Sequence, residues 1–512
     1  MIRAAPAQPS AVFESDVCII VEGCYPYVPG GVSAWIDWLM RSQPNTSFSV
    51  VALWPRPTKA LPRYEPPPNL LRLDHLYLQQ FGAQPTSRGK APEGIGRLGD
   101  CLTGLMTGGG CQALSDVMAE VARVRGRYSL DTMFNSPAAW QIVQDMYRRE
   151  MPYGSFLHYF WAWRALLGGL LSVLEFPLPR AKVYHTISTG YAGLFAARAR
   201  LETGRPALLT EHGIYTNERR IELLMADWVA DTIDKGHALD DSRIDLRDMW
   251  IRAFEAYART CYETVTNVVT LYSDNQMPQR LLGAVESKLQ VIANGIDLKR
   301  FANLDQAPAT VRPTMALIGR VVPIKDVKTY IEAAALMRVE IPDLRAWVIG
   351  PTDEDAEYHK ECQALVADLG LEETVIFTGS VNVLDYLAQI HVMVLTSLSE
   401  SQPLVVLEAG AAGIPFVSTD VGSCREIIEG LPTENPHFGR GGTITHLAAA
   451  DEIAAAAAKL LRDHDLRTRA GQALRQRVAT HYTSEKAAAA YHNLYTSLAS
   501  APSEPLSTKR GG

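Results

Sequence analysis

The chain has 512 residues, enough for two or three domains at about 150 residues each. Apolar residues make up 47% and charged residues 21%, as in soluble globular proteins, which excludes disordered, collagen-like and disulfide-scaffold classes. The 49 Lys and Arg against 56 Asp and Glu give a formal net charge of −7, which argues against a general affinity for anionic lipid and predicts no nucleic-acid partner. A local basic pocket for a phosphorylated small molecule is compatible with this balance.

Cysteine usage and the apolar segments indicate a cytoplasmic protein. The seven Cys residues are scattered and form no Cys-x-x-Cys pair, which favours a reducing compartment over a zinc site or a disulfide framework. Residues 1–15 lack the apolar core of a signal peptide. The stretch Phe156–Leu178 is the most apolar, but its uncharged part is too short to span a bilayer. We expect a buried or interfacial helix there.

Short apolar runs rich in Val and Ile recur along the chain, each followed by a turn and a helical pattern. In the first half these runs are Val17–Val21, Phe48–Trp54, Val183–Ser188, Ala207–Thr210, Val268–Leu271 and Leu289–Ile292. In the second half they are Thr314–Ile318, Leu344–Ile349, Val375–Phe377, Val392–Leu395 and Phe416–Ser418. Such runs are typical of parallel strands buried on both faces, with helices as crossovers. The pattern therefore predicts an α/β protein with two doubly wound, Rossmann-like domains.

Breaks in this pattern suggest the domain limits. We expect the first domain over residues 13–302 and the second over residues 310–482, because residues 301–313 contain two prolines and interrupt the series. Residues 80–165 show helical patterns and few strand signals, and we interpret them as a helical insert in the first domain. Residues 483–500 are expected to form a C-terminal helix that packs back toward the first domain.

The strongest chemical signal is Glu400-Ser-Gln-Pro-Leu-Val-Val-Leu-Glu408, in which two glutamates flank seven residues. It follows the run Val392–Leu395 and opens a helix, with Pro403 suited to its first turn and Gly413 to its end. A helix N-terminus lies between the two carboxylates, and its unpaired N–H groups and positive dipole end suit a diphosphate. Taken alone, two glutamates in a helix are more often a solvated pair.

A second motif, Gly319-Arg-Val-Val-Pro-Ile-Lys325-Asp326, follows the first strand of the second domain. Its Gly permits a close backbone approach, and Arg320 and Lys325 can neutralise a pyrophosphate. Taken alone it is more often an ordinary polar loop. Both motifs follow strands of the same sheet, however, and ligands of open α/β sheets bind at the carboxyl ends of the strands. Together the two motifs predict a nucleotide-sugar site.

With Val291-Ile-Ala-Asn294-Gly295-Ile-Asp297, these motifs resemble the family 4 retaining glycosyltransferases, which have the two-Rossmann GT-B fold. The segments Thr210-Glu-His-Gly-Ile-Tyr-Thr216 and Val21-Glu-Gly-Cys-Tyr-Pro-Tyr-Val-Pro-Gly-Gly-Val-Ser33 look like those of the PelF-type enzymes of Pel exopolysaccharide synthesis. The resemblance covers residues 16–500. It implies two domains that face a central cleft, and transfer of a sugar from a UDP-sugar donor to a growing polysaccharide or lipid-linked acceptor. It also implies work beside inner-membrane synthase and export proteins.

The resemblance assigns roles to matching residues of the second domain. Arg320 and Lys325 would bind the donor diphosphate and stabilise the negative charge of the leaving group. Glu400 would face the transferred sugar, and Glu408 would take the ribose hydroxyls. The phosphate cradle and the base site would be completed by the backbone of Leu404, Val405 and Gly379.

In the first domain, the resemblance places His212 near the sugar and the Gly30-Gly31 loop near the phosphates and the acceptor. The predicted catalytic residues are therefore Glu400, His212, Lys325 and Arg320. One position departs from the family pattern, which has Gly after the first glutamate, where this chain has Ser401. The Ser is either a strained residue or a helix cap.

We expect no required metal and no other cofactor. The sequence Asp353-Glu-Asp355 matches the DxD pattern of metal-dependent glycosyltransferases, but it opens a helical run, where carboxylates serve as caps. Two alternative functions stay open. A nucleotide-sugar epimerase would need an acid–base pair that the sequence does not identify, and a non-catalytic UDP-sugar-binding subunit of a synthase complex would not need all the charged motif residues. The sequence does not distinguish between glucose, N-acetylglucosamine and N-acetylgalactosamine as the transferred sugar.

Overall fold

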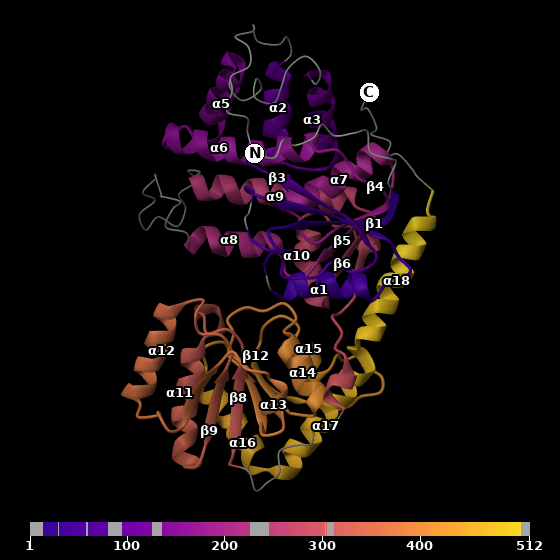
Figure 1. Ribbon diagram of the computed structural model, residues 1–512. Helices are drawn as coiled ribbons and strands as arrows, with labels where there is room; N and C mark the ends of the chain where they lie inside the picture. Colours follow the sequence, from indigo (N-terminus) through magenta and orange to yellow (C-terminus); the bar gives the residue numbers. More distant parts are fainter. Residues whose placement is uncertain are drawn as a thin grey trace, which may run out of the picture. The chain divides into compact units, whose positions relative to one another are not determined.

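Two parallel β-sheets, each in its own structural unit, organise the chain (Figure 1). The computed structural model describes residues 14–28, 30–57, 60–79, 95–124, 136–225, 245–302, 304 and 312–502. Unit 1 comprises Met1–Thr270, Asn275–Gln290 and Tyr491–Gly512, and unit 2 comprises Leu271–Asp274 and Val291–Ala490. The predicted pair of Rossmann-like α/β domains is thereby confirmed.

The sheet of unit 1 has seven strands in the order β3-β2-β1-β4-β5-β6-β7. Its strands are β1 (Glu14–Glu22), β2 (Phe48–Trp54), β3 (Leu70–Tyr77), β4 (Arg180–Thr186), β5 (Ala207–Glu211), β6 (Asn267–Thr270) and β7 (Leu289–Val291). The central strand β1 pairs in parallel with both β2 and β4, so that Ile19 lies opposite Val50 and His185. Because helices cover both faces, β1 and β2 are buried along nearly their whole length.

The helices of unit 1 include a helical region between β3 and β4. In its described parts, the predicted insert over residues 80–165 consists of α2, α3, α5 and the start of α6. Among the residues that the structure describes, no helix combines the length and the apolar character needed to cross a membrane. The helices of this unit are α1 (Gly31–Arg41), α2 (Ile95–Thr107), α3 (Cys111–Val124), α5 (Pro137–Glu150), α6 (Phe156–Glu175), α7 (Tyr191–Thr203), α8 (Tyr215–Met225), α9 (Leu246–Thr264) and α10 (Gln276–Leu281).

The sheet of unit 2 has six strands in the order β10-β9-β8-β11-β12-β13. Its strands are β8 (Thr314–Ile318), β9 (Arg345–Ile349), β10 (Val375–Gly379), β11 (Val392–Leu395), β12 (Phe416–Thr419) and β13 (Gly442–Thr445). Alternate side chains of β8 pack into two separate cores: Met315 and Leu317 belong to one, and Ala316 belongs to the other. The helices that follow the strands are α11 (Val327–Glu340), α12 (Ala356–Asp368), α13 (Leu384–Leu387), α14 (Leu404–Ala412), α15 (Cys424–Glu429), α16 (Ala450–Arg462), α17 (His464–His481) and α18 (Ser484–Ser500).

Two strands were not predicted, and both lie at the edge of a sheet. The edge strand β3 is half exposed and carries Arg72 and Asp74, so it shows no continuous apolar run. The edge strand β13 has the sequence Gly-Thr-Ile-Thr and is only partly apolar. A strand with one neighbour does not need two buried faces, and its sequence therefore lacks the signal of a central strand.

The boundary between the units differs from the predicted one. The change of unit falls between Gln290 and Val291, before the proline-containing segment 301–313. The backbone N–H of Asn294 donates to Gln402 at 2.6 Å, Ile296 forms an isolated bridge with Thr483, and Phe301 is buried in a unit 2 core. The prolines mark a break in the strand–helix series, but the residues before them already pack on unit 2.

The C-terminal helix α18 supplies aromatic residues to unit 1. Its Tyr495 hydroxyl is hydrogen-bonded with His185 Nδ1 at 2.7 Å, and its Tyr491 hydroxyl with Thr210 Oγ1 at 3.1 Å. Burial lowers the pKa of His185 to about 3, so this imidazole is neutral. The second half of α18 therefore belongs to the core of unit 1, while residues 484–490 belong to unit 2.

A buried arginine on α17 joins three parts of unit 2. The Arg477 guanidinium forms an ion pair with Glu434 at 2.6 Å and also donates to the carbonyl groups of Ile427, Ile428 and Gly439. The Arg477 side chain is 1% exposed and that of Glu434 6%. Burial alone would raise the pKa of Glu434, but the hydrogen bonds and charge of Arg477 lower it below its ordinary value.

We expect Arg477→Met to lower the free energy of unfolding of unit 2 by about 3–5 kcal/mol, because it leaves a buried carboxylate without its partner. Scanning calorimetry should show a lower temperature for the unit 2 transition and an unchanged transition for unit 1. The matched control is Arg425→Met, which removes exposed ion pairs to Asp420 and Glu429 and should cost less than about 1 kcal/mol. Equal effects of the two substitutions would contradict this account.

Candidate functional site

The two charged motifs of unit 2 lie where the strand order reverses. From β8 the chain continues to β9 and β10 on one side, whereas β11, β12 and β13 lie on the other. In open α/β folds the loops on either side of such a reversal flank the usual ligand position at the carboxyl edge of the sheet, which we call the crevice of unit 2. The loops after β8 and β11 carry Lys325 and Glu400.

Backbone hydrogen bonds hold the two loops together. The N–H of Leu398 donates to the carbonyl of Ile324 at 2.9 Å, and the Thr396 hydroxyl donates to the carbonyl of Lys325 at 2.8 Å. Asp326 has a φ of 46°, a left-handed conformation that is costly for a residue other than Gly. Its carboxylate accepts from the Thr329 hydroxyl at 2.6 Å and caps α11. The backbone beside Lys325 is thus fixed in a strained conformation, which is typical of functional loops.

Lys325 and Glu400 form an ion pair in this crevice. The Ser397 hydroxyl donates to the same Glu400 oxygen, Oε1, at 2.7 Å. The side chains of Lys325 and Glu400 are 17% and 14% exposed, so the pair is largely shielded from water but reachable from the crevice. The structure therefore brings together Lys325 and Glu400, two of the four residues predicted as catalytic, and it adds Ser397, which has no sequence signal of its own.

Helix α14 presents its N-terminus next to Glu400. It runs from Leu404 to Ala412 and ends at Gly413, which has the left-handed φ of 73° expected of a helix stop. Pro403 occupies the N-cap position, one residue before the first turn in which it was predicted, and provides no side-chain cap. The first N–H groups of a helix have no intrahelical acceptor, so those of Leu404 and Val405 can bind an anion.

Ser401 does not have a positive φ and does not occupy the N-cap of α14, so neither a left-handed backbone nor the N-cap position accounts for this residue. The described residues other than Gly with positive φ are Asp326 and Ala448, and the N-cap of α14 is Pro403. The Ser401 carbonyl accepts from the N–H of Ser423 at 2.8 Å, and a Cβ at Gly422 would collide with that carbonyl oxygen. The glycine that this loop requires is Gly422, on the neighbouring loop after β12.

The second glutamate of the motif lies deeper along α14. Glu408 follows Leu404 by four residues, which corresponds to about 6 Å along the helix axis. Burial raises the pKa of Glu408, and the charge of Arg300 partly opposes this effect. Glu408 is therefore a shielded carboxyl group that feels the charge of Arg300, in the segment before β8.

The remaining predicted residues of unit 2 lie at the same edge of the sheet. Gly379 ends β10 with a φ of 69°, and its carbonyl accepts from the N–H of Gly350 at 3.1 Å. Gly350 follows β9, and a Cβ there would collide with the carbonyl oxygen of Gly319 after β8. Three adjacent strands thus end in glycines whose backbones approach closely, a feature that the sequence reasoning noted only in part.

The acidic segment Asp353–Asp355 serves as predicted in helix capping. The Asp355 carboxylate accepts from the N–H of Tyr358 at 3.0 Å and caps α12. Its neighbour Glu354 forms an ion pair with Arg320, which was not predicted. Within the described ranges, no three His, Cys, Asp or Glu side chains gather in a way that could hold a metal ion.

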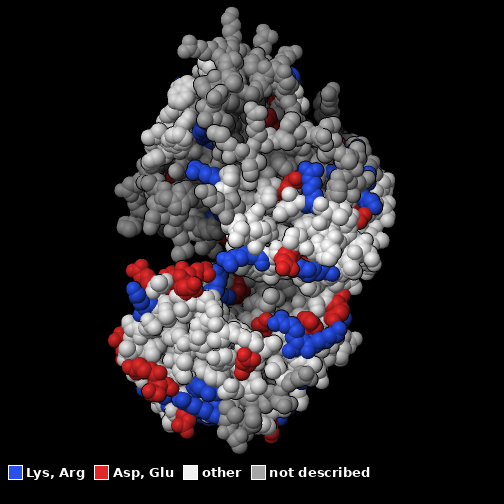
Figure 2. All heavy atoms as spheres, viewed as in Figure 1, with Lys and Arg blue, Asp and Glu red and all other residues white. Residues whose placement is uncertain are grey.

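Several exposed cations of unit 2 are paired with carboxylates. Besides Arg320 with Glu354, Lys328 contacts Glu361 at 2.7 Å and Arg425 contacts Asp420 at 2.6 Å. Figure 2 shows blue and red side chains next to one another over the described atoms of unit 2 on this face. An incoming anion therefore has to exchange with a carboxylate at Arg320 and Lys325.

In unit 1, the predicted residues follow β1 and β5. The ring of His212 lies 4.5 Å from that of Trp35 on α1, edge to face, and burial lowers the pKa of His212 to about 4. Gly31 begins α1 and Gly30 is its N-cap, with open space where a Cβ would lie at either position. The neutral His212 thus contacts Trp35, which lies on α1, and α1 begins at the Gly30-Gly31 loop.

The sequence reasoning missed a pair of buried carboxyl groups beside His212. Glu211 accepts from the Tyr262 hydroxyl at 2.6 Å and from the Gln279 amide at 2.9 Å. Glu22, at the end of β1, accepts from the Tyr215 hydroxyl at 3.1 Å, and burial raises its pKa. Burial also raises the pKa of Glu211 to about 7, although its hydrogen bonds favour the ionised form. The one sequence signal for Glu211 is its position as a charged residue at the end of a mostly apolar strand, Leu-Leu-Thr-Glu.

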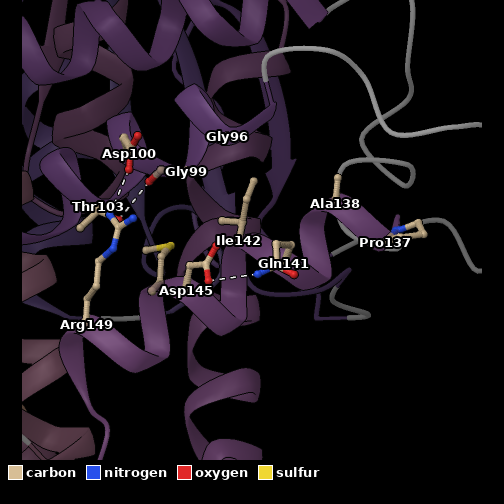
Figure 3. A pocket seen from close by; sticks show the side chains of 11 residues that line it. Gly96, Gly99, Asp100, Thr103, Pro137, Ala138, Gln141, Ile142, Asp145 and Arg149 are labelled. Carbon is tan, nitrogen blue, oxygen red and sulfur yellow. Dashed lines mark hydrogen bonds and ion pairs between the residues drawn. The ribbon is translucent and has the colours of Figure 1, made fainter.

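A cavity of about 440 Å³ lies elsewhere in unit 1, between α2 and α5 (Figure 3). Arg149 and Asp100 form an ion pair at 3.0 Å beside it, and Ile142 and Met146 provide apolar lining. None of the described residues that line it belongs to the predicted site residues. This cavity therefore does not coincide with the charged crevice of unit 2, which holds Lys325 and Glu400.

Two family models match the chain. One, described as "Domain of unknown function (DUF3492)", covers residues 15–287, and the other, described as "Glycosyl transferases group 1", covers residues 304–477. The first match spans more than half of the chain, which therefore belongs to the DUF3492 family. Its second half carries a glycosyl transferases group 1 domain, in agreement with the predicted family 4 type.

Curated relatives match part of the chain. It is 31% identical to the N-acetyl-alpha-D-glucosaminyl L-malate synthase of Bacillus anthracis, over 34% of this chain and 42% of the relative. It is 30% identical to the lipopolysaccharide core biosynthesis glycosyltransferase LpsE of Rhizobium meliloti, over 41% of this chain and 58% of the relative. The chain thus covers less than two thirds of the length of these relatives.

Solved structures share the fold over nearly the whole chain. The sucrose-phosphate synthase of Thermosynechococcus elongatus superposes with a TM-score of 0.56 and 17% identity, covering 94% of this chain and 98% of that one. HepE of Anabaena, crystallised with UDP and glucose, gives a TM-score of 0.56 and 14% identity, covering 94% and 100%. The GT-B fold class predicted from the sequence is confirmed.

The Glu211 carboxyl group makes a pH-dependent contribution to the stability of unit 1. Between its ordinary pKa of 4.5 and about 7, the folded protein holds a proton on Glu211 that the unfolded chain has lost. Raising the pH through this range therefore lowers the free energy of unfolding. We expect this loss to be smaller in Glu211→Gln, as measured by urea unfolding of unit 1 at a series of pH values. Identical pH profiles in the two proteins would contradict the raised pKa.

Proposed function

We propose that this member of the DUF3492 family is a retaining glycosyltransferase that moves a sugar from a UDP-sugar to a growing exopolysaccharide of the Pel type. The observation that carries the proposal is the Lys325–Glu400 ion pair beside the N-terminus of α14, inside the glycosyl transferases group 1 domain. Support also comes from relatives named as glycosyltransferases and from crystals of HepE with UDP and with UDP-glucose.

The cations and the helix N-terminus suit the donor diphosphate. Arg320 and Lys325 supply positive charge, and the N–H groups of Leu404 and Val405 supply hydrogen-bond donors that need no reorganisation. As the bond between the sugar and the phosphate breaks, negative charge grows on the phosphate oxygen. Groups already aimed at that oxygen stabilise the transition state more than the bound donor.

The two glutamates of the motif suit the neutral parts of the donor. Glu408, a shielded carboxyl group about 6 Å along α14 from Leu404, is positioned to accept hydrogen bonds from the ribose hydroxyls. Glu400 faces the transferred sugar, orients its hydroxyl groups and supports the positive charge of an oxocarbenium-like transition state. Binding of the diphosphate draws Lys325 from Glu400, which makes this carboxylate available to the sugar. The glycine-lined edge after Gly379 leaves room for the base.

The transfer proceeds with retention at the anomeric carbon. The bond from this carbon to the diphosphate oxygen breaks while a bond to the acceptor hydroxyl oxygen forms on the same face of the sugar. The departing phosphate oxygen takes the acceptor proton, so no covalent enzyme intermediate and no metal ion are required. In unit 1, the neutral His212 and the Gly30-Gly31 loop serve the sugar and the acceptor.

The nature of the acceptor rests on sequence resemblance. The segments 21–33 and 210–216 resemble those of PelF-type enzymes, and a polymer of N-acetylhexosamine units is the corresponding product. Such an enzyme would work beside inner-membrane synthase and export proteins.

The first experiment is nucleotide release by the purified full-length chain from UDP-, GDP- and ADP-linked sugars, with EDTA and with Mg²⁺. The proposal predicts release of UDP from one sugar, unaffected by EDTA. Interconversion of two UDP-sugars without an acceptor would instead identify an epimerase. Binding of UDP-sugars without release of UDP in the presence of any acceptor would favour a non-catalytic subunit. Absence of UDP binding would refute the glycosyltransferase, the epimerase and the binding-subunit assignments.

We expect Lys325→Ala and Glu400→Ala each to lower the rate of sugar transfer by about a hundredfold or more, because each removes a group that stabilises the transition state. Lys328→Ala is the matched control, since Lys328 lies on the next helix in an exposed ion pair with Glu361. Its activity should equal that of the wild type. Circular dichroism should show that all three variants are folded, and near-wild-type turnover of either site variant would overturn the assignment.

We expect Glu354→Gln to tighten the binding of UDP about two- to fivefold, because an exposed ion pair competes weakly with the diphosphate for Arg320. Isothermal titration calorimetry measures this change. Glu361→Gln removes another exposed carboxylate at this side of the sheet, one that pairs with Lys328, and should leave UDP binding unchanged. Weaker binding in Glu354→Gln would show that Glu354 positions Arg320 for the donor and does not compete with it.

A further inference from the structure

An aromatic patch is exposed on the helical region of unit 1, on elements that carry none of the residues of the proposed reaction. It consists of Trp140 on α5, Tyr153 in the connection to α6, and Leu157 and Trp161 on α6. These side chains are 47%, 75%, 61% and 59% exposed, respectively. Single exposed apolar side chains are ordinary, but four large ones in one region mark an interaction surface.

The patch rests on a rigid aromatic base. Trp140 contacts the rings of Phe156 and Phe160 at centroid distances of 5.4 and 5.7 Å, and Phe160 contacts Trp161 at 5.3 Å. Leu157, Trp161 and Arg164 follow one another at helical spacing and so lie on one stripe of α6. The second half of α6, by contrast, is buried against the rest of unit 1. Figure 1 shows α5 and α6 at the margin of this unit.

The charges around the patch favour an anionic partner. No Asp or Glu occurs from Met151 to Leu174, whereas His158 and Arg164 lie within this segment. The N-terminus of α6, a helix of 20 residues, places its positive dipole end at the patch. On α5, Arg148 and Arg149 are exposed and pair with Asp145 and Asp100.

Another carboxyl group in the described part of this region, that of Glu150, is shielded. Glu150 accepts from the Tyr159 hydroxyl at 3.1 Å, and burial raises its pKa. The acidic groups near the patch are therefore paired or partly buried. Trp and Tyr beside Arg, on a helix face without acidic residues, match the boundary between the headgroups and the acyl chains of a bilayer.

We propose that this patch docks unit 1 on an anionic phospholipid surface, with Leu157 and Trp161 inserted at the level of the headgroups. The net charge of −7 of the whole chain does not prevent this, because electrostatic attraction to a surface acts over about 10 Å and depends on local charge. The helix lies on the surface and does not cross the bilayer. This docking is independent of the sugar-transfer reaction and needs neither donor nor acceptor.

Vesicle flotation of the full-length chain tests the proposal. We expect the wild type to float with vesicles of phosphatidylcholine mixed with phosphatidylglycerol, and less with phosphatidylcholine alone or at high salt. The double variant Leu157→Ser/Trp161→Ser should partition about tenfold less, because it removes most of the apolar area that enters the headgroup layer. Since both side chains are mostly exposed, its thermal unfolding should match that of the wild type.

The matched control is Leu336→Ser/Val339→Ser, which removes two exposed apolar side chains from α11 in unit 2. It should float like the wild type. The proposal is overturned if the wild type floats with neither vesicle, if it floats equally with both, or if the patch variant floats as well as the control. It is also overturned if the wild type is a dimer that the patch variant dissociates while neither protein floats, since the patch would then bind a second copy of the chain.

Discussion

The parallel pairing of β8 with β9 on one side and β11 on the other is the constraint on which the site of unit 2 depends. The carboxyl ends of parallel strands all lie at one edge of the sheet, and the usual ligand position at that edge is where the strand order reverses. A single strand thereby sets Gly319, Arg320 and Lys325 beside the loop that carries Glu400. The hydrogen bonds of Leu398 and Thr396 then fix the two loops, so that a cation and a carboxylate meet in a shielded position.

Much of this arrangement could be predicted because burial leaves a strong pattern in the sequence. Strand β8 has the same limits, Thr314–Ile318, in the prediction and in the structure, since both of its faces are buried. Lys325 and Glu400 were predicted at one edge because both motifs follow strands of the same parallel sheet. The edge strands β3 and β13, and the early boundary at Val291, leave no such pattern, because half-exposed strands and packed linkers tolerate polar residues.

The contacts that the sequence could not predict are those between side chains distant in the chain. The ion pair of Arg320 with Glu354 and the buried Glu211 beside His212 depend on which loops and helices pack together, and no residue spacing encodes that choice. Gly422 was likewise missed. Only glycine fits at this position because a Cβ would collide with the Ser401 carbonyl, which lies on another loop. These contacts set the local charge and backbone conformation, whereas the buried strands and helices around them could be predicted from the sequence.

The division of α18 between the units bears on how the protein is made. Tyr491 and Tyr495 of unit 1 follow unit 2 along the chain, so unit 2 can complete its fold on the ribosome before these residues of unit 1 are available. Until Tyr491 and Tyr495 emerge, His185 and Thr210 lack their hydroxyl partners in the centre of a sheet. Unit 1 therefore completes its core only after α18 has been synthesised, and a fragment that ends before α18 is a poor choice for expression.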